Sequence, residues 1–239
     1  MKTLSQRSDL VVIGSGLAGI CAAVSASREG ATVCLIESRS CIGGRIGKEI
    51  QFPYDFEGTT NYAYQRETGI LDEIKTTIYQ ENQEGNYCGQ ERALISWIRK
   101  QERVELFLET QLFEVKKNSA GDKIESIIAI SSQRGGRIIF RAPYFIDCSG
   151  NGTLSQLANA PGETGLDKRE YEKSSASSTP VTFRAAASMQ LTVSANPVPF
   201  KLPSWVSLKW EENHQSAKLD LLESLDKQIQ GVHNVEWLG

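Results

Sequence analysis

Apolar residues near the start of the chain fall into two short runs on either side of a helix-forming segment. Residues 9–13 and 31–36 are rich in β-branched side chains, which is typical of strands buried on both faces of a parallel sheet. Residues 16–29 between them are mostly helix formers, and Gly30 follows as a helix-stop residue. The pattern therefore predicts a strand–helix–strand unit.

One amphipathic helix and one extended segment are predicted next. Ile70, Leu71, Ile74 and Ile78 recur at helical spacing and share one face. Residues 104–115 are strand-like. This part of the chain predicts a helical insertion followed by a return to β-structure.

The chain then predicts a β-meander and one further strand. Residues 112–117 and 123–132 are strand-like and flank NSAGD, a hairpin-type turn. A second turn, RGG, leads into a strand over residues 136–141. Residues 144–147 form a last short strand that ends in Cys-Ser-Gly-Asn-Gly, and helix formers follow over residues 154–160.

The pattern changes after Ala160, so we expect two domains, over residues 1–160 with a helical insertion around 50–103, and over residues 161–239. The second domain has a serine-rich linker, a strand-like segment, an extended proline-rich segment and an amphipathic helix. These lie at residues 173–180, 181–193, 195–205 and 219–229. The fold class expected is α/β, a Rossmann-like parallel sheet with a β-meander, followed by an incomplete second domain.

Composition removes several classes of function. The 239 residues carry a formal net charge of −3, which gives no electrostatic reason to expect a nucleic-acid partner. No apolar run approaches the roughly 20 residues needed to cross a bilayer, and the N-terminal residues lack a signal-peptide core. We expect no membrane partner and a cytoplasmic location.

Cysteine and histidine usage gives no metal site. The chain has five cysteines with no C-x-x-C pair, and two histidines, His214 and His233, both late in the chain. An odd number of unpaired cysteines disfavours both a disulfide framework and zinc.

Three glycines between the first strand and the helix carry the main candidate chemistry. Gly14, Gly16 and Gly19 have the spacing G-x-G-x-x-G, and Glu37 follows at the end of the second strand. In a strand–helix–strand setting, these glycines give a tight turn, a close approach to a pyrophosphate and close helix–sheet packing. The carboxylate can accept the two hydroxyls of an adenosine ribose. The alternative is a structural turn with a surface glutamate.

Residues 14–23, GSGLAGICAA, and 38–45, SRSCIGGR, together resemble flavoproteins with two dinucleotide-binding domains. In that superfamily the acid and the later glycine pair are typical of FAD rather than NAD. RETGILDEI at 66–74 and FIDCSGNGTLSQLANA at 145–160 resemble the bacterial FAD-dependent oxidoreductase family. The resemblance covers most of residues 8–160, and the alternative for Gly43–Gly44 taken alone is an ordinary flexible turn.

The resemblance implies an FAD site but no catalytic residue. It places the Leu112 backbone against the adenine, and Gly43, Gly44 and Arg45 beside the diphosphate and ribityl chain. The implied cofactor-binding residues are Gly14, Ser15, Gly16, Leu17, Ala18, Gly19, Glu37, Ser38, Arg39, Gly43, Gly44, Arg45, Leu112, Cys148, Ser149 and Gly150.

Four other residues bear on the chemistry. Asp147 is expected to be a turn or capping group rather than an acid catalyst. Arg45 and Arg66 could hold an anionic substrate or the flavin, or be surface arginines. Cys41 precedes Gly43 and no second cysteine follows, which disfavours a redox disulfide of the disulfide-reductase type.

The resemblance predicts an FAD-dependent oxidoreductase with an unknown small-molecule substrate. Family members are longer and return to the first domain near their C-terminus, so we expect a truncated form, a fragment or one component of an assembly. Uncovered apolar sheet surface, or a second copy or partner subunit that covers it, would follow. The alternatives are a non-catalytic FAD- or ADP-binding remnant and an NAD-dependent dehydrogenase.

Overall fold

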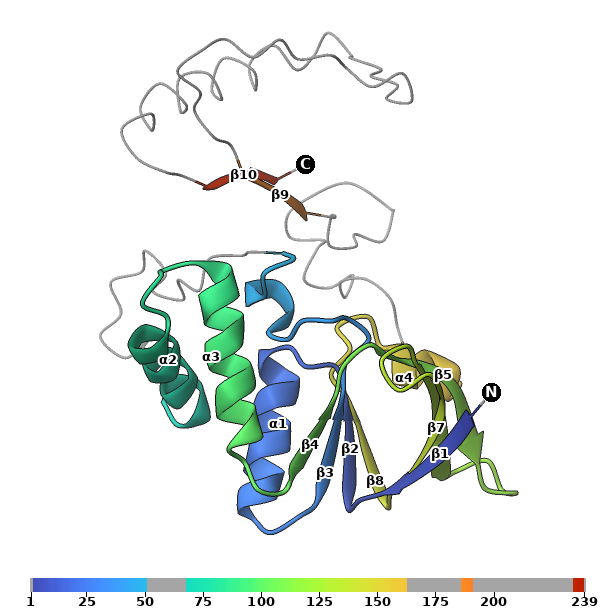
Figure 1. Cartoon of the computed structure of the whole chain (residues 1–239). Coiled ribbons are helices and arrows are strands. Elements are labelled where there is room, and N and C mark those ends of the chain that lie inside the picture. Colours follow the sequence, from blue (N-terminus) through green and yellow to red (C-terminus); the bar gives the residue numbers. More distant parts are fainter. Residues whose placement is uncertain (1, 51–67, 163–185, 191–233, 239) are drawn as a thin grey trace, which may run out of the picture. The chain divides into compact units, whose positions relative to one another are not determined.

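The computed structural model describes residues 2–50, 68–162, 186–190 and 234–238 (Figure 1). The chain divides into two units, Met1–Pro180 and Val181–Gly239. In the second unit, β9 (Ala186–Gln190) and β10 (Asn234–Leu238) form an antiparallel pair. β9 lies within the strand-like segment predicted at 181–193. The linker, proline-rich segment and amphipathic helix predicted in this part lie outside the described residues.

A parallel four-stranded sheet forms the centre of the first unit, in the order β4-β3-β2-β8. Its strands are β4 (Val104–Phe107), β3 (Val33–Ile36), β2 (Leu10–Ile13) and β8 (Tyr144–Asp147). Every residue of β2 and β3 is buried, as their apolar sequences predict. The predicted strand–helix–strand unit and Rossmann-like sheet are confirmed.

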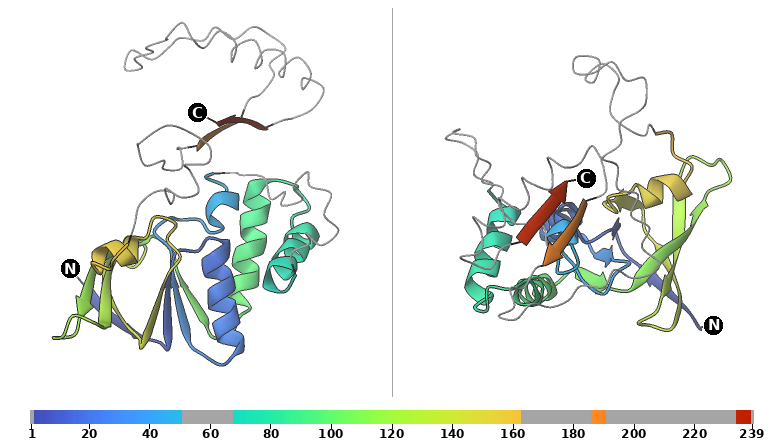
Figure 2. Two further views of the ribbon diagram at one scale, coloured as in Figure 1. Left: turned by 180° about the vertical axis from the view of Figure 1, so that it is seen from behind. Right: turned by 90° about the horizontal axis from the view of Figure 1, so that it is seen from above.

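Three helices lie on one side of this sheet: α1 (Leu17–Arg28), α2 (Ile70–Glu81) and α3 (Tyr87–Arg99) (Figures 1 and 2). They share one apolar cluster with β2 and β3, in which Val12, Leu35, Ile74 and Leu94 are fully buried. α2 confirms the helix predicted from the spacing of Ile70 and its partners. α3 was not predicted as a separate helix, and it packs against α2 and β4.

A second sheet faces the other side of the central sheet, in the order β1-β7-β6-β5. It contains β1 (Lys2–Arg7), β7 (Gly136–Arg141), β6 (Ile124–Ser131) and β5 (Thr110–Lys117). The meander β5-β6-β7 confirms the prediction. The single strand-like segment predicted over 104–115 is instead two strands in different sheets, because the chain turns between β4 and β5.

β1 is a polar strand that the hydrophobic pattern did not reveal. It pairs in parallel with β7, with Lys2 opposite Gly136 and Arg7 opposite Arg141. A side chain at position 136 would overlap the Lys2 carbonyl oxygen, so this pairing depends on a glycine. The backbone hydrogen bonds, not burial, hold the strand, since its side chains are exposed or half-buried.

The second apolar cluster fills the space between the two sheets. It joins Val11, Ile13 and Ile36 of the central sheet to Ile127 and Ile138 of the meander. The largest side chains in it are phenylalanines: the rings of Phe107 and Phe140 meet edge-to-face with centroids 4.9 Å apart. The Arg134 guanidinium lies 4.2 Å from the Phe107 ring centroid, so one aromatic ring links both sheets and a surface cation.

The helical layer stops short of β8. Tyr144 and Ile146 align with Leu10 and Val12 of β2, and adjacent parallel strands in register place these residues on the same face. Leu10 and Val12 are buried under α1, whereas Tyr144 is 70% and Ile146 37% exposed. Among the described residues, β2 is the only strand that pairs with β8. Within the described part of the chain, this edge therefore exposes the side chains of Tyr144 and Ile146, and the expectation of a truncated form stays a prediction.

The α4 helix (Thr153–Leu157) follows β8 and is shorter than the segment predicted at 154–160. None of the described helices is long and apolar enough to cross a membrane.

We predict that Phe107→Ala lowers the free energy of unfolding by about 3–5 kcal/mol, because it leaves a cavity between the two sheets. Urea denaturation followed by circular dichroism measures this change. Phe113→Ala on β5 is the matched control: Phe113 is 52% exposed, so this variant should lose less than about 1 kcal/mol. Equal losses in the two variants would contradict the assignment of Phe107 to a packed core.

Candidate nucleotide-binding site

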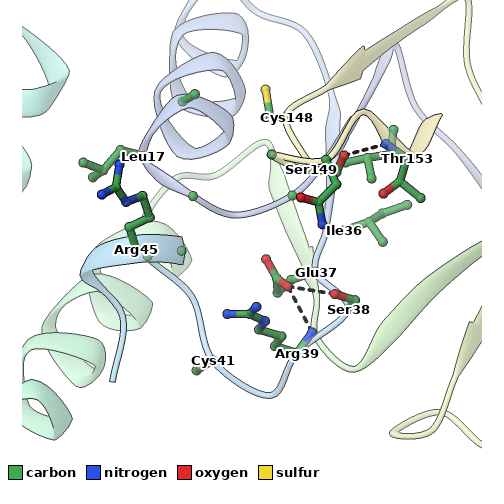
Figure 3. A pocket seen from close by; sticks show the side chains of 18 of the residues that line it. Leu17, Ile36, Glu37, Ser38, Arg39, Cys41, Arg45, Cys148, Ser149 and Thr153 are labelled. Carbon is green, nitrogen blue, oxygen red and sulfur yellow. Dashed lines mark hydrogen bonds between the residues drawn. The ribbon is translucent and has the colours of Figure 1, made fainter. Parts of the chain in front are cut away.

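A pocket of about 660 Å³ lies at the carboxyl ends of β2, β3 and β8 (Figure 3). Its walls come from the glycine loop before α1, the loop after β3, the start of β5 and the turn between β8 and α4. The carboxyl edge is where parallel α/β sheets bind ligands, because loops from several strands converge there.

The pocket brings together all but two of the residues predicted to bind a cofactor. Its lining contains the glycine loop, the end of β3 with its following loop, one meander residue and the turn after β8; the residues are Gly14, Gly16, Leu17, Ala18, Glu37, Ser38, Arg39, Gly43, Gly44, Arg45, Leu112, Cys148, Ser149 and Gly150. The two predicted residues outside the lining are Ser15 and Gly19.

Two of the three motif glycines are required by the protein's own packing. Gly14 has φ +97°, and a side chain there would overlap the carbonyl oxygen of Cys148. A side chain at Gly19 would overlap the carbonyl oxygen of Gly14. At Gly16 the nearest atom to an added Cβ, Cα of Gly44, is 4.0 Å away. Gly16 therefore faces open space in the pocket, which leaves room for a ligand to approach the backbone.

The later glycine pair contacts the first glycine loop directly. Gly43 and Gly44 have φ +97° and +57°. The Gly43 N–H donates to the Ser15 carbonyl oxygen over 2.9 Å, and a Cβ on Gly44 would lie 2.9 Å from Cα of Gly16. The sequence resemblance placed this pair beside a ligand, whereas the structure also gives it a role in packing two loops together.

The Glu37 carboxylate is buried and accepts four hydrogen bonds from the protein. Oε2 accepts from the Ser15 N–H at 2.9 Å and from the Ser15 hydroxyl at 2.7 Å. Oε1 accepts from the Arg39 N–H at 3.0 Å and from the Ser38 hydroxyl at 3.2 Å. Figure 3 shows the last two bonds beside the pocket. Glu37 thus ties the glycine loop to the end of β3.

This network limits the ways in which a ribose could contact Glu37, and that contact stays a prediction. A carboxylate has about four lone-pair positions, and in the described structure all four meet protein donors. The Ser38 hydroxyl is the longest of the four bonds and can rotate away. A ribose hydroxyl could therefore reach Oε1 by replacing Ser38, whereas the two bonds from Ser15 hold Oε2 inside the protein.

Backbone bonds place the start of β5 in the pocket. The Thr110 N–H donates to the Glu37 carbonyl oxygen at 2.8 Å, and the Glu109 N–H donates to that of Arg39 at 2.9 Å. Leu112 consequently lies in the lining, as the resemblance implied. Sequence reasoning missed the rest of the lining, which adjoins the predicted residues along the chain: Ile13, Ile36, Cys41, Ile46, Ile50, Thr110, Gln111, Asn151 and Thr153.

The electrostatics of the pocket favour an anion near α1. The N-cap residue Gly16 has no side chain to satisfy the first N–H groups, and the first turn contains no acidic residue. A helix N-terminus of this kind carries a partial positive charge. Arg45, from the short 3₁₀ helix η1 (Gly44–Ile46), lines the same pocket as Leu17 at the start of α1 (Figure 3). Arg39 pairs with Glu49 at 3.4 Å on the partly exposed rim.

Neither pocket thiol is activated. Burial, with a smaller contribution from Glu49 and Glu91, raises the pKa of Cys41 to about 11. Burial and the neighbouring Asp147 raise the pKa of Cys148. Both thiols are therefore protonated at neutral pH, and the thiolate is the reactive form. Neither cysteine is therefore present as a thiolate nucleophile at neutral pH.

Asp147 fixes the turn between β8 and α4, as expected. Its Oδ1 accepts from the Ser149 N–H at 3.1 Å and the Ser149 hydroxyl, and its Oδ2 accepts from the Ser155 N–H at 2.9 Å and the Ser155 hydroxyl at 3.0 Å. Burial raises the pKa of Asp147, but these hydrogen bonds outweigh it and hold the pKa below its ordinary value. Asp147 is absent from the pocket lining.

The remaining candidate residues from the sequence do not form a second catalytic or metal site in the part of the chain that is described. Arg66, His214 and His233 lie outside these residues. Among the described residues, no three His, Cys, Asp or Glu side chains form a group that could hold a metal ion.

The chain belongs to the FAD dependent oxidoreductase family, whose sequence profile matches residues 9–236. No curated protein shows significant sequence similarity to it.

Solved structures with a similar fold are distant and mostly longer. The THI4 protein of Thermovibrio ammonificans has 19% identity and a TM-score of 0.44, with 70% of each chain covered. A geranylgeranyl bacteriochlorophyll reductase-like protein of Thermoplasma acidophilum has 17% identity and a TM-score of 0.43, with 64% of this chain and 42% of that chain covered. L-proline dehydrogenase of P. horikoshii has 18% identity and a TM-score of 0.37, with 62% of this chain and 24% of that chain covered. The chain thus spans about a quarter of the proline dehydrogenase.

We predict that Asp147→Asn destabilises the protein at neutral pH and that this difference fades in acid. A carboxyl whose native pKa is depressed stabilises the fold above its unfolded-state pKa of about 3.9 and loses that contribution as pH falls through the lower native pKa. Chemical denaturation at neutral pH and at about pH 3 measures the difference.

Glu125→Gln, at an exposed position of β6, removes one negative charge elsewhere and is the control. A loss of stability in Asp147→Asn that is the same at both pH values would contradict the capping assignment.

Proposed function

We propose that the pocket binds FAD through its ADP half and that the chain is the nucleotide-binding part of a flavin-dependent oxidoreductase. The observation that carries this proposal is the meeting of three glycine-containing loops around one pocket at the carboxyl edge of the sheet. Membership of the FAD dependent oxidoreductase family supports the identity of the ligand.

The residues present fit a dinucleotide. Gly16 faces open space beside the N-terminus of α1, which suits a pyrophosphate that must approach the backbone closely. Arg45 lines the same pocket and would add positive charge. Glu37 and Ser38 would receive the adenosine ribose, and Gln111 and Leu112 would border the base.

When bound, FAD would supply the redox chemistry by accepting electrons from a substrate. The described residues would bind and orient the cofactor and exclude water from its phosphate side. Both pocket thiols stay protonated, and Asp147, which precedes the lining residue Cys148 but is not itself in the lining, is bonded within its turn, so we give neither the thiols nor Asp147 a proton-transfer role.

We also propose that this chain takes part in catalytic turnover. We infer a small-molecule substrate, a cytoplasmic setting, and a second copy or partner subunit over the exposed edge at β8. The competing functions are a non-catalytic FAD- or ADP-binding remnant, which would bind without turnover, and an NAD-dependent dehydrogenase. The glycine pair after Glu37 favours FAD over NAD by resemblance.

We predict that the purified protein, incubated with FAD and freed of unbound ligand, retains the visible absorption of oxidised flavin. Gly16→Ala should weaken FAD binding by about tenfold, because its methyl group enters the space meant for the ligand. Its melting temperature should not change, since the nearest protein atom to the added carbon is 4.0 Å away.

Gly162→Ala is the matched control, because no protein atom lies within 4 Å of its added carbon and its φ is not positive. A colourless protein that binds NADH but no FAD would support the dehydrogenase instead. A yellow protein whose flavin is reduced by a chemical reductant but by none of the candidate substrates would support the remnant.

We also predict that the protein prefers ADP to 2′-deoxy-ADP by about fivefold, the value of one hydrogen bond of roughly 1 kcal/mol. Glu37→Gln should reduce this preference, because the carboxylate that receives the ribose is lost. Isothermal titration calorimetry with each nucleotide measures the ratio of affinities.

Ser15→Ala is the control: it removes the hydroxyl that supports Glu37 but keeps the carboxylate. This variant should weaken the binding of both nucleotides and leave the ratio of their affinities unchanged. An unchanged ratio in Glu37→Gln would overturn the ribose assignment.

A further inference from the structure

The loop that carries the later glycine pair is held from outside the nucleotide-binding motif. Residues 41–48, here called the glycine-pair loop, contain Gly43 and η1 and form one wall of the pocket. Ile42 and Ile46 anchor this loop in the apolar cluster beneath it. In the same cluster lie Leu94 and Ile98 of α3, the helix that the sequence pattern did not resolve.

Two polar side chains of α3 continue this contact. The Gln90 amide donates from Nε2 to the Ile46 carbonyl oxygen at 2.7 Å. The Glu91 carboxylate meets the Lys48 ammonium group at 2.8 Å, and this hydrogen bond raises the pKa of Lys48. Both Gln90 and Glu91 are buried. They are polar, whereas the next buried positions of α3, such as Leu94 and Ile98, hold apolar residues.

Buried polar residues of this kind are a poor means of stabilising a helix. Burial of an amide or a carboxylate costs free energy, and apolar side chains of similar size often stabilise a core as well or better. Gln90 and Glu91 instead fix the position of the glycine-pair loop, because each bonds to one residue of that loop. Together with Ile42 and Ile46, they fix the loop at both the backbone and a side chain.

The fixed loop in turn sets the geometry beside the pocket. The Gly43 N–H bonds to the Ser15 carbonyl oxygen at 2.9 Å, and Gly44 packs on Gly16. The contact from α3 therefore reaches the residues at which the ligand is expected to approach, through one short stretch of chain.

We propose that Gln90 and Glu91 are positioning residues for the nucleotide site: through Ile46 and Lys48 they hold the glycine-pair loop against the loop before α1, so that the helical insertion preorganises the pocket. Neither residue lines the pocket, so both act through the loop. The effect on ligand affinity rests on the proposed function, whereas the effect on the loop does not.

Amide hydrogen–deuterium exchange of the full ligand-free chain tests the loop. In Gln90→Leu the Ile46 carbonyl loses its donor, and in Glu91→Gln the ion pair with Lys48 is lost. We expect the amides of Gly43 and Gly47 to exchange about tenfold faster in Gln90→Leu and by a smaller factor in Glu91→Gln, while β2 and β3 keep their wild-type rates.

Two variants away from the loop are matched controls. Gln101→Leu removes an amide that bonds to the Trp97 carbonyl at the end of α3, and Glu81→Gln removes a partner of Lys100 between α2 and α3. Neither should alter exchange at Gly43. If Gln90→Leu and Glu91→Gln leave exchange in the loop unchanged, or raise it equally in β2 and β3, the positioning role is wrong.

Titration with FAD tests the consequence for the site. We expect about tenfold weaker binding for Gln90→Leu and a wild-type affinity for Gln101→Leu. If the wild-type protein binds no FAD, the proposed function fails and the exchange result still decides the positioning role. If the wild-type protein binds FAD and Gln90→Leu binds it equally well, the proposed link to the site fails.

Discussion

Close backbone contact at the carboxyl edge of the central sheet is the constraint on which the site depends. Gly14 lies against the Cys148 carbonyl, Gly19 against Gly14, and Gly44 against Gly16. None of these contacts leaves room for a side chain. Three segments that are far apart in the sequence converge here because the loop before α1 and the loop after β3 have glycines at these contacts, while the segment after β8 contributes the Cys148 carbonyl. The pocket is the space that remains between them.

Hydrogen bonds then lock this arrangement. Glu37 accepts both donors of Ser15 and so joins the loop after β2 to the end of β3. The backbone of Glu37 bonds in turn to Thr110 at the start of β5. One buried carboxylate and its own backbone thus connect the central sheet, the glycine loop and the meander. Such a residue has a structural role even without a ligand.

The parts of the fold that local sequence determines could be predicted. β2, β3 and α1 follow from apolar runs and a helix-forming segment, and β7 and β8 lie at the predicted residues. β1 could not be predicted in this way, because its polar side chains are not buried and a distant strand supplies its hydrogen bonds.

The same distinction applies to the site. Glycine spacing identified the loop before α1, where Gly14 and Gly19 are required by close backbone contacts, and the family resemblance supplied most of the other predicted lining residues. The two donors that Ser15 directs at Glu37, and the contacts of Gln90 and Glu91 of α3, depend on tertiary structure that no local pattern records. The break between β4 and β5 was missed because both strands are apolar enough to be taken for one, although Glu109 between them has a positive φ of 46°.

The pairing of β8 with β2 has a consequence for how this chain is made. Leu10 lies opposite Tyr144, and Lys2 lies opposite Gly136. During synthesis, β1 and β2 leave the ribosome long before β7 and β8, because they lie near the N-terminus. Their sheets can be completed only after these later strands have been synthesised. Pairings between such distant residues also slow folding, since the chain must close a long loop before it gains these contacts. The polar sequence of β1 suits this interval, because an unpaired hydrophilic strand stays hydrated and is less prone to aggregate than an apolar one.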